Sequence, residues 1–160
     1  MMDRSLSFPR VVIAAPQGRS GKTTVSIGIC AALAARGVVV QPFKKGPDYI
    51  DPSWLSEASG HPCRSLDPFF FSSGDSPSPA MLQQAIRKGA TGADITLVEG
   101  NHGLYDSSLD EDGAYSTAAV ARAVGAPVIL VINAARMARS AAAMVMGYQA
   151  FEPSTRIAGV

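Results

Sequence analysis

The residues best suited to chemistry lie near the N-terminus, in the segment Ala15–Thr24 with the sequence APQGRSGKTT. A phosphate loop usually has the form G-x-x-x-x-G-K-[ST] and lies between a strand and a helix. Pro16 takes the place of the first glycine, so this loop is a variant. Because Gly18, Ser20 and Gly21 can still turn backbone N–H groups around an anion, the segment predicts binding of nucleotide phosphates.

The side chains of this loop predict ATP with Mg²⁺ as the ligand. Lys22 supplies a point charge for the β- and γ-phosphates, and Thr23 offers a hydroxyl group to the metal ion. Arg19 can contact phosphate or point into solvent, and both interpretations stay open. The predicted ATP-binding residues of the loop are Gly18, Arg19, Ser20, Gly21, Lys22, Thr23 and Thr24.

Two carboxylates are candidates for the metal and the reaction. Glu99 ends the apolar segment ITLVE, at the carboxyl edge of a predicted parallel strand, where ligands bind in such sheets. Asp48 follows another predicted strand in KKGPDYIDP and can reach the same edge, with a turn-forming role after Pro47 as an equal alternative. Mg²⁺ usually takes one or two carboxylates. The predicted metal ligands are Thr23, Asp48 and Glu99, and the predicted catalytic residues are Lys22, Asp48 and Glu99.

The elements that must position these residues alternate between strands and helices. Strands are predicted over residues 10–15, 38–43, 95–99 and 127–133, with a further apolar run from 157. Helices are predicted over residues 23–36, 80–88, 116–124 and 137–150. This order is typical of right-handed crossovers between parallel strands. The predicted fold is therefore α/β, a phosphate-loop NTPase-like, doubly wound and mostly parallel sheet in three α/β/α layers.

Two segments show no clear periodicity. Lys44–Phe71 carries prolines and several aromatic residues, and we interpret it as an active-site excursion rather than a linker. Ser72–Pro79 is predicted to be a turn or loop that leads into the next helix. His102 has no partner at metal or triad spacing, so the sequence favours a structural or substrate-edge role for it.

Composition excludes several classes of protein. Hydrophobic residues make up 47% and charged residues 17% of the chain, which is typical of a globular domain. The net charge of +1 gives no indication of nucleic-acid or anionic-membrane binding. No apolar segment is long enough to span a membrane. The two cysteines have no metal-type spacing, Cys30 is expected in the core, and a reduced cytoplasmic setting is predicted.

Five sequence blocks resemble the N-terminal domain of the cobyrinic acid a,c-diamide synthase family. They are GRSGKTTVSIGICAALAARG, VQPFKKGPDYIDP, GHPCRSLDPF, VEGNHGLYD and NAARMARSAAAMVMGYQAF. The similarity extends from about Val11 to Val160, and FKKGPDYIDP and VEG-x-x-GLYD are its most specific parts. The resemblance implies a domain related in fold to dethiobiotin synthetase.

The resemblance also implies an activity. Members are ligases of cobalamin biosynthesis that use ATP and glutamine to amidate peripheral carboxylates of a tetrapyrrole. The N-terminal domain phosphorylates a carboxylate, and ammonia then displaces phosphate from the acyl phosphate. By the same resemblance Thr23, Asp48 and Glu99 contact Mg²⁺, and Lys22 contacts the phosphates. It further implies substrate contacts by Lys44, Tyr49, Ile50 and Asp106, and base or ribose contacts by Asn133 and Arg136.

The resemblance carries an expectation about domain organisation. Residues 1–160 correspond to the ATP-binding synthetase domain, and the C-terminal glutaminase domain of the family is missing from this sequence. We therefore expect a truncated chain that cannot use glutamine by itself, although free ammonia can serve. The expected partners are the tetrapyrrole substrate and the glutaminase domain, with a homodimer as a further possibility.

Three alternatives remain at this point. The same chemistry can act on a sirohydrochlorin-type tetrapyrrole or on sirohaem, because GLYD and GPDYID are shared among these relatives. A nucleotide-switch ATPase of the partition type usually has a lysine where this chain has Gln17, which argues against that class. A dethiobiotin synthetase fits the fold but not the long GPDYIDP–LDPF excursion.

Overall fold

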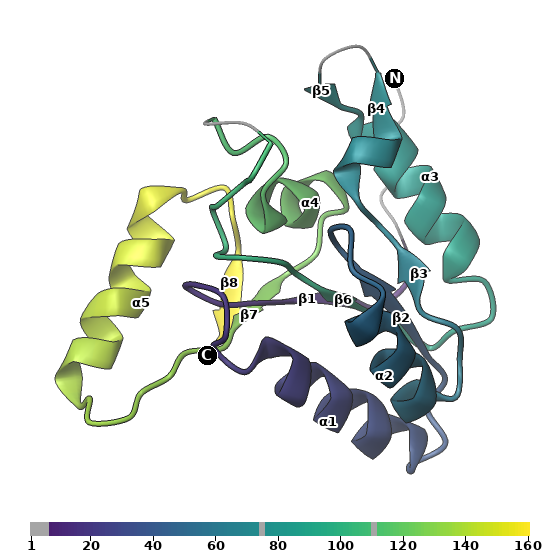
Figure 1. The fold of residues 1–160 in the computed structure, drawn as a ribbon, viewed down its shortest axis with the longest axis horizontal. Coiled ribbons are helices and arrows are strands. Elements are labelled where there is room, and N and C mark those ends of the chain that lie inside the picture. The colour runs from purple at the N-terminus through teal and green to yellow at the C-terminus, as the bar shows by residue number, and fades with distance from the viewer. Residues whose placement is uncertain (1–6, 74–75, 110–111) are drawn as a thin grey trace.

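A parallel sheet forms the centre of the molecule (Figure 1). The computed structural model describes residues 7–73, 76–109 and 112–160. The strands of the main sheet, in spatial order, are β3 (Arg64–Ser65), β2 (Val40–Lys44), β6 (Ile95–Glu99), β1 (Arg10–Ala14), β7 (Val128–Leu130) and β8 (Ile157–Gly159). Each neighbouring pair in this order is parallel. The predicted α/β class and parallel sheet are therefore confirmed.

Helices cover both faces of this sheet. They are α1 (Lys22–Ala34), α2 (Ile50–Ser59), α3 (Pro79–Gly89) and α4 (Thr117–Ala123), whereas α5 (Arg139–Phe151) has no buried residue and only partly buried Val145 and Tyr148 pack on the core. Successive strand residues point to opposite faces, so Ile13 packs with Cys30 and Leu55 of α1 and α2, whereas Val12 joins the cluster that contains Leu82 of α3. These two clusters give the predicted three layers, and the expectation that Cys30 belongs to the core is confirmed.

The excursion after β2 is more regular than its sequence indicates. Residues 50–59 form helix α2, which the sequence analysis did not predict. Pro52 sits in its first turn, where proline is tolerated, and the helix shows little amphipathic periodicity. Tertiary packing explains its formation, because Leu55 is fully buried against α1 and the sheet. The 3₁₀ helix η1 (Pro68–Phe71) follows, with the Asp67 carboxylate accepting a hydrogen bond from the Phe69 N–H at its start.

Two further segments differ from expectation. The segment predicted as a loop at 72–79 contains two short antiparallel strands, β4 (Ser72–Ser73) and β5 (Ser76–Pro77), before α3 begins at Pro79. The strand predicted over 127–133 is shorter in the structure, where β7 spans Val128–Leu130 between β1 and β8, although the Val131 N–H still donates to the Ala14 carbonyl of β1. Its last predicted residues lead directly into the loop before α5.

The topology fixes where a site can form. The chain leaves β1 for β2, returns to β6 between them, and then continues to β7 and β8 on the other side of β1. The order of strands therefore reverses beside β1, and ligands bind in such sheets at the carboxyl ends of the strands next to this reversal. Within the described residues, none of the helices has both the length and the apolar character needed to cross a bilayer.

Candidate functional site

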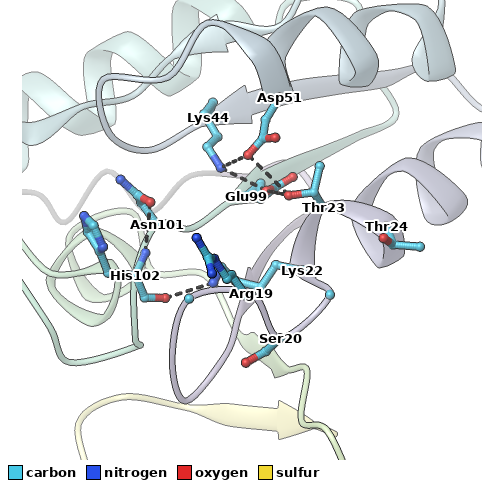
Figure 2. A pocket seen from close by; sticks show the side chains of 12 residues that line it. Arg19, Ser20, Lys22, Thr23, Thr24, Lys44, Asp51, Glu99, Asn101 and His102 are labelled. Carbon is cyan, nitrogen blue, oxygen red and sulfur yellow. Dashed lines mark hydrogen bonds and ion pairs between the residues drawn. The ribbon is translucent and has the colours of Figure 1, made fainter.

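The loop between β1 and α1 lies at this reversal point and lines a cavity of about 380 Å³ (Figure 2). Gly21 precedes α1 with a left-handed φ of 89°, a conformation that glycine adopts without the penalty of a Cβ atom. No side chain among the described residues caps this helix end. The unpaired N–H groups of its first turn and its positive dipole end therefore face the cavity, which favours an anion.

Lys22 is a buried cation that forms no ion pair with a described carboxylate. Its Nζ donates hydrogen bonds to the carbonyl oxygens of Gln17 at 3.2 Å and His102 at 2.9 Å. Burial, followed by the nearby charge of Lys44, lowers the pKa of Lys22. Both effects would be offset by an anion in the cavity, since opposite charge favours the protonated form. The loop thus holds a positive charge that phosphate would neutralise.

Four side chains form a polar cluster on the other side of the cavity (Figure 2). The Thr23 hydroxyl lies 2.7 Å from Glu99 Oε1 and 3.2 Å from Asp51 Oδ2. Lys44 Nζ donates to the same two oxygens, at 2.7 Å from Asp51 and 2.9 Å from Glu99. The cluster joins α1, β2, α2 and β6, so the tertiary structure alone brings its members together.

Burial sets the electrostatics of this cluster. Desolvation alone would lower the pKa of Lys44, but the charge of Glu99 and the hydrogen bonds to Asp51 and Glu99 outweigh it, so that pKa is raised. For Asp51, burial acts upward, and the hydrogen bond and charge of Lys44 outweigh it, so the pKa of Asp51 is lowered. Both shifts favour the charged forms of the Lys44–Asp51 pair, which holds the two side chains in place.

Glu99 fits a metal ion because half of its carboxylate has no partner. The side chain is fully buried, and Oε2 makes no hydrogen bond with any described group. A buried carboxylate oxygen without a partner is costly unless a cation or donor approaches it. Thr23, Asp51 and Glu99 together supply hydroxyl and carboxylate oxygens, the donor set that Mg²⁺ prefers. No group of three or more His, Cys, Asp or Glu with metal-binding geometry occurs among the described residues, so nucleotide phosphates would have to complete such a site.

The structure distinguishes between two aspartates in KKGPDYIDP. Asp48, which was predicted from the sequence, does not line the cavity. Its Oδ1 accepts hydrogen bonds from the backbone N–H groups of Ile50 and Asp51, and its Oδ2 lies 3.8 Å from Lys44 Nζ. Asp51 lines the cavity and contacts Thr23, and the sequence analysis missed it. The only signal in the sequence was its position one residue before Pro52, which suits the first turn of a helix.

The other predicted residues are distributed more widely. Gly18 to Thr24, predicted to bind the nucleotide, and Lys44, predicted to contact the substrate, all line the cavity. Tyr49 and Ile50 lie nearby at the start of α2 and are exposed. Asp106 lines a separate cavity with residues of α5, and Asn133 and Arg136 line neither cavity.

Comparison with known sequences gives one family and several relatives. A family model described as CobQ/CobB/MinD/ParA nucleotide binding domain matches residues 11–160. The chain is 47% identical over 153 residues to the cobyrinate a,c-diamide synthase of Magnetococcus marinus, covering 96% of this chain and 31% of the relative. It is 46% identical over 158 residues to the hydrogenobyrinate a,c-diamide synthase of Streptomyces coelicolor, covering 99% of this chain and 31% of the relative. The chain therefore spans about a third of the length of these relatives.

Comparison with solved structures concerns the fold alone. The signal recognition particle 54 kDa protein of Aeropyrum pernix, solved in complex with GDP, matches 97% of this chain and 35% of its own, with a TM-score of 0.60 at 23% identity. The hydrogenase maturation factor HypB of Archaeoglobus fulgidus matches 96% of this chain and 81% of its own, with a TM-score of 0.51 at 13% identity. Both agree with the predicted phosphate-loop NTPase-like architecture.

Proposed function

Because the chain belongs to the CobQ/CobB/MinD/ParA nucleotide binding domain family, we propose that it is the ATP-binding part of a tetrapyrrole-amidating ligase. The proposed substrates are ATP, ammonia and a cobyrinate- or hydrogenobyrinate-type tetrapyrrole, whose peripheral carboxylates become amides. The observation that carries the proposal is the cluster in which Thr23 of the phosphate loop contacts Asp51 and Glu99, with Lys44 bound to both carboxylates. Similarity to two diamide synthases supports the choice of substrate class.

The proposed reaction has two steps, phosphorylation of the acceptor carboxylate and displacement of the phosphate by ammonia. An oxygen of the acceptor carboxylate attacks the γ-phosphorus of ATP, the bond from that phosphorus to the bridging oxygen breaks, and ADP leaves. Ammonia then attacks the carbonyl carbon of the acyl phosphate, loses a proton, and expels phosphate together with the original carboxylate oxygen. Such phosphoryl transfer needs positioning and charge neutralisation more than acid–base chemistry.

The residues of this chain supply those requirements. Lys22 and the N-terminus of α1 would hold the phosphates, and Thr23, Asp51 and Glu99 would hold Mg²⁺, which would neutralise phosphate charge when bound. Lys44 lines the cavity with Asp51 and Glu99, and its ammonium donates to both carboxylates and to the Gly100 carbonyl, so it would act on the acceptor carboxylate through its positive charge. Burial of Lys44 strengthens this electrostatic effect, because the local dielectric is low.

The proposal extends to the surroundings of the reaction. Ammonia would come from glutamine through a glutaminase domain, which is the partner that the family resemblance implies. The proposed setting is the cytoplasm, where ATP is available and free thiols such as those of Cys30 and Cys63 stay reduced. A homodimer is a further part of the proposal.

The direct test is acceptor-dependent turnover. The chain is incubated with Mg·ATP and ammonium, with cobyrinate, hydrogenobyrinate or a sirohydrochlorin-type tetrapyrrole as acceptor. We expect ADP release to rise with cobyrinate or hydrogenobyrinate, and mass spectrometry to detect the amide. Stimulation by the sirohydrochlorin type alone would change the substrate assignment. ATP-dependent dimerisation with no stimulation by any acceptor would contradict the ligase and favour a nucleotide switch.

A matched pair of variants tests the site. Asp51→Asn should lower acceptor-dependent turnover by roughly tenfold or more at limiting Mg²⁺, since losing even an outer partner of a metal typically costs tenfold or more. Asp48→Asn keeps an oxygen that can accept from the Ile50 N–H, so a loss confined to Asp51→Asn assigns the metal to Asp51. A loss confined to Asp48→Asn would instead support the original sequence prediction.

A further inference from the structure

A second cavity lies directly beside the phosphate cavity. Its volume is about 290 Å³, and it shares Asn101 and His102 with the larger one. Its walls come from the segments that follow β2, β3 and β6, all at the carboxyl edge of the sheet. Asn101 and His102 therefore form a common wall between the second cavity and the phosphate cavity.

Asn101 and His102 form the partition between the two cavities, and packing and hydrogen bonds hold both residues in place. The Asn101 side chain packs on Gly46, where an added Cβ atom would lie only 2.6 Å from Asn101 Nδ2. Asn101 Oδ1 accepts a hydrogen bond from the His102 N–H at 3.0 Å, and the His102 carbonyl oxygen accepts from Lys22 at 2.9 Å. The partition thus contacts the phosphate-loop lysine itself, and Figure 2 shows Asn101 and His102 on the side of the loop that faces away from Thr24.

The outer wall of the second cavity is apolar and exposed. Phe69 is 58% exposed, Phe70 65% and Leu109 55%, and the two phenyl rings meet edge to face with centroids 5.5 Å apart. Helix η1 holds the rings in place, because Asp67 accepts from the Phe69 N–H and the Ser72 hydroxyl donates to the Pro68 carbonyl. Exposed rings on a fixed turn offer a ready apolar contact surface.

Exposed large apolar side chains are concentrated on the segments that follow three neighbouring strands of the sheet. Among the described residues, six of the ten exposed large hydrophobic side chains lie on segments that follow β2, β3 or β6. They are Tyr49, Ile50, Trp54, Phe69, Phe70 and Leu109. Such a concentration marks a binding surface rather than scattered exposure. Lys45 is buried in the wall of the same cavity, so a positive charge lies behind the apolar surface.

We propose that Phe69, Phe70 and Leu109 form an apolar shelf for the tetrapyrrole acceptor, whose reacting carboxylate is directed past Asn101 and His102 toward the phosphate loop. This inference rests on the proposed function and adds the residues that determine acceptor binding. The acceptor combines an apolar macrocycle with peripheral carboxylates, and the surface combines exposed phenyl rings with Lys45 and the nearby Lys22 and Lys44. The two chemistries are complementary.

The size of the second cavity limits what enters it. A volume of about 290 Å³ is at the lower end of the range for small-ligand pockets. It therefore admits one edge of the macrocycle with its side chain, while the rest of the macrocycle stays outside over the exposed rings. This geometry presents one peripheral carboxylate at a time to the phosphate loop.

The test measures acceptor and nucleotide binding separately. Trp54 is the only tryptophan of the chain and is 59% exposed on α2, so its fluorescence reports binding of the light-absorbing cobyrinate or hydrogenobyrinate. Phe70→Ala and the double variant Phe69→Ala/Phe70→Ala remove exposed rings, and both should fold normally. We expect roughly two- to tenfold weaker acceptor binding for each ring removed and an unchanged ATP affinity.

Phe151→Ala is the matched control, because Phe151 is 75% exposed on α5 and lines a different cavity with Tyr105 and Tyr148. It should bind the acceptor as the parent chain does. Parent-like acceptor binding by the shelf variants overturns the shelf, and weakened binding by Phe151→Ala alone moves the acceptor to the α5 cavity. A parent chain that binds ATP but no tetrapyrrole overturns the proposed function and the shelf with it.

Discussion

At the scale of single residues, the chemistry of the site depends on which polar side-chain atoms have hydrogen-bond partners. Glu99 uses one carboxylate oxygen for Thr23 and Lys44 and leaves the other without a described partner. The Thr23 hydroxyl has a single proton to donate to two neighbouring carboxylates, so Lys44 must supply the remaining donors. Asp48 and Asp51 are three positions apart, and only the start of α2 decides which of them faces the cavity.

The Lys44–Asp51 pair predicts a specific pH dependence of stability. The pKa of Asp51 is lowered from 3.8, so its ionised form adds stability above that value, and this contribution is lost as the pH falls through the lower folded-state pKa. The pKa of Lys44 is raised from 10.5, so its contribution is lost only at more alkaline pH.

Urea unfolding of the parent chain and of Asp51→Asn measures this effect. The parent should be more stable than the variant near neutral pH, and the difference in unfolding free energy should shrink as the pH falls below about 4. A difference that stays constant through this range would contradict an ionised, Lys44-paired Asp51.

At the scale of elements, the transition from β1 to α1 determines the phosphate loop. The helix begins without a side-chain cap in the described part of the chain, and Gly21 turns the backbone with a positive φ. Arg19 also has a positive φ of 59°, although it carries a side chain, so the loop is held in a conformation that most residues avoid. This geometry leaves the helix N-terminus open for an anion.

Substitutions at Gly21 and Gly28 test whether the positive φ at the start of α1 is required. An added Cβ atom meets nothing within 4 Å at Gly21 or at Gly28, but only Gly21 has a positive φ. Gly21→Ala should therefore destabilise the chain by about 1–2 kcal/mol, whereas Gly28→Ala in the interior of α1 should stabilise it by roughly 0.5–1 kcal/mol. Thermal unfolding and nucleotide titration check this, and equal stabilisation by both variants would refute the strained loop conformation.

At the scale of the whole molecule, the segment after β6 ties the site together. The Leu104 N–H donates to the Ala15 carbonyl at 2.8 Å, and the Tyr148 hydroxyl of α5 donates to the Pro16 carbonyl at 3.1 Å. The Tyr105 hydroxyl donates in turn to the Tyr148 carbonyl at 2.6 Å. The segment after β6 and helix α5, both far from the phosphate loop in the sequence, therefore hydrogen-bond to its first residues.

A substitution at Gly103 tests how closely the segment after β6 packs against the phosphate loop. An added Cβ atom at this position would lie 2.6 Å from the Pro16 carbonyl oxygen, which cannot move without shifting the phosphate loop. Gly103→Ala should cost about 1–3 kcal/mol of stability through overpacking and should weaken nucleotide binding.

Gly147→Ala serves as the control for this prediction, since nothing lies within 4 Å of its added Cβ atom in α5. Denaturant unfolding with nucleotide titration of both variants gives the comparison. Full stability and parent-like nucleotide affinity in Gly103→Ala would refute the close packing of the two loops.

The sequence by itself determined the fold class, the family resemblance and the phosphate loop. Strands β1 and β6 and the glycine-lysine-threonine triplet are local patterns, with apolar runs and turn residues in fixed order, so no distant contact is needed to predict them. The fold and the resemblance are confirmed. The predicted ligand, substrate and catalytic roles of the individual site residues remain predictions, including those of Asn133, Arg136, Tyr49 and Ile50.

Only the tertiary structure decided which side chains meet. Helix α2 forms because Leu55 buries against α1 and the sheet, which no local period in its sequence indicates. That helix turns Asp51 toward Thr23 and Lys44 and uses Asp48 for its own backbone N–H groups. The second cavity likewise forms where the segments that follow β2, β3 and β6 come together. Packing between distant segments fixed these placements, and its energy depends on contacts that the order of residues does not display.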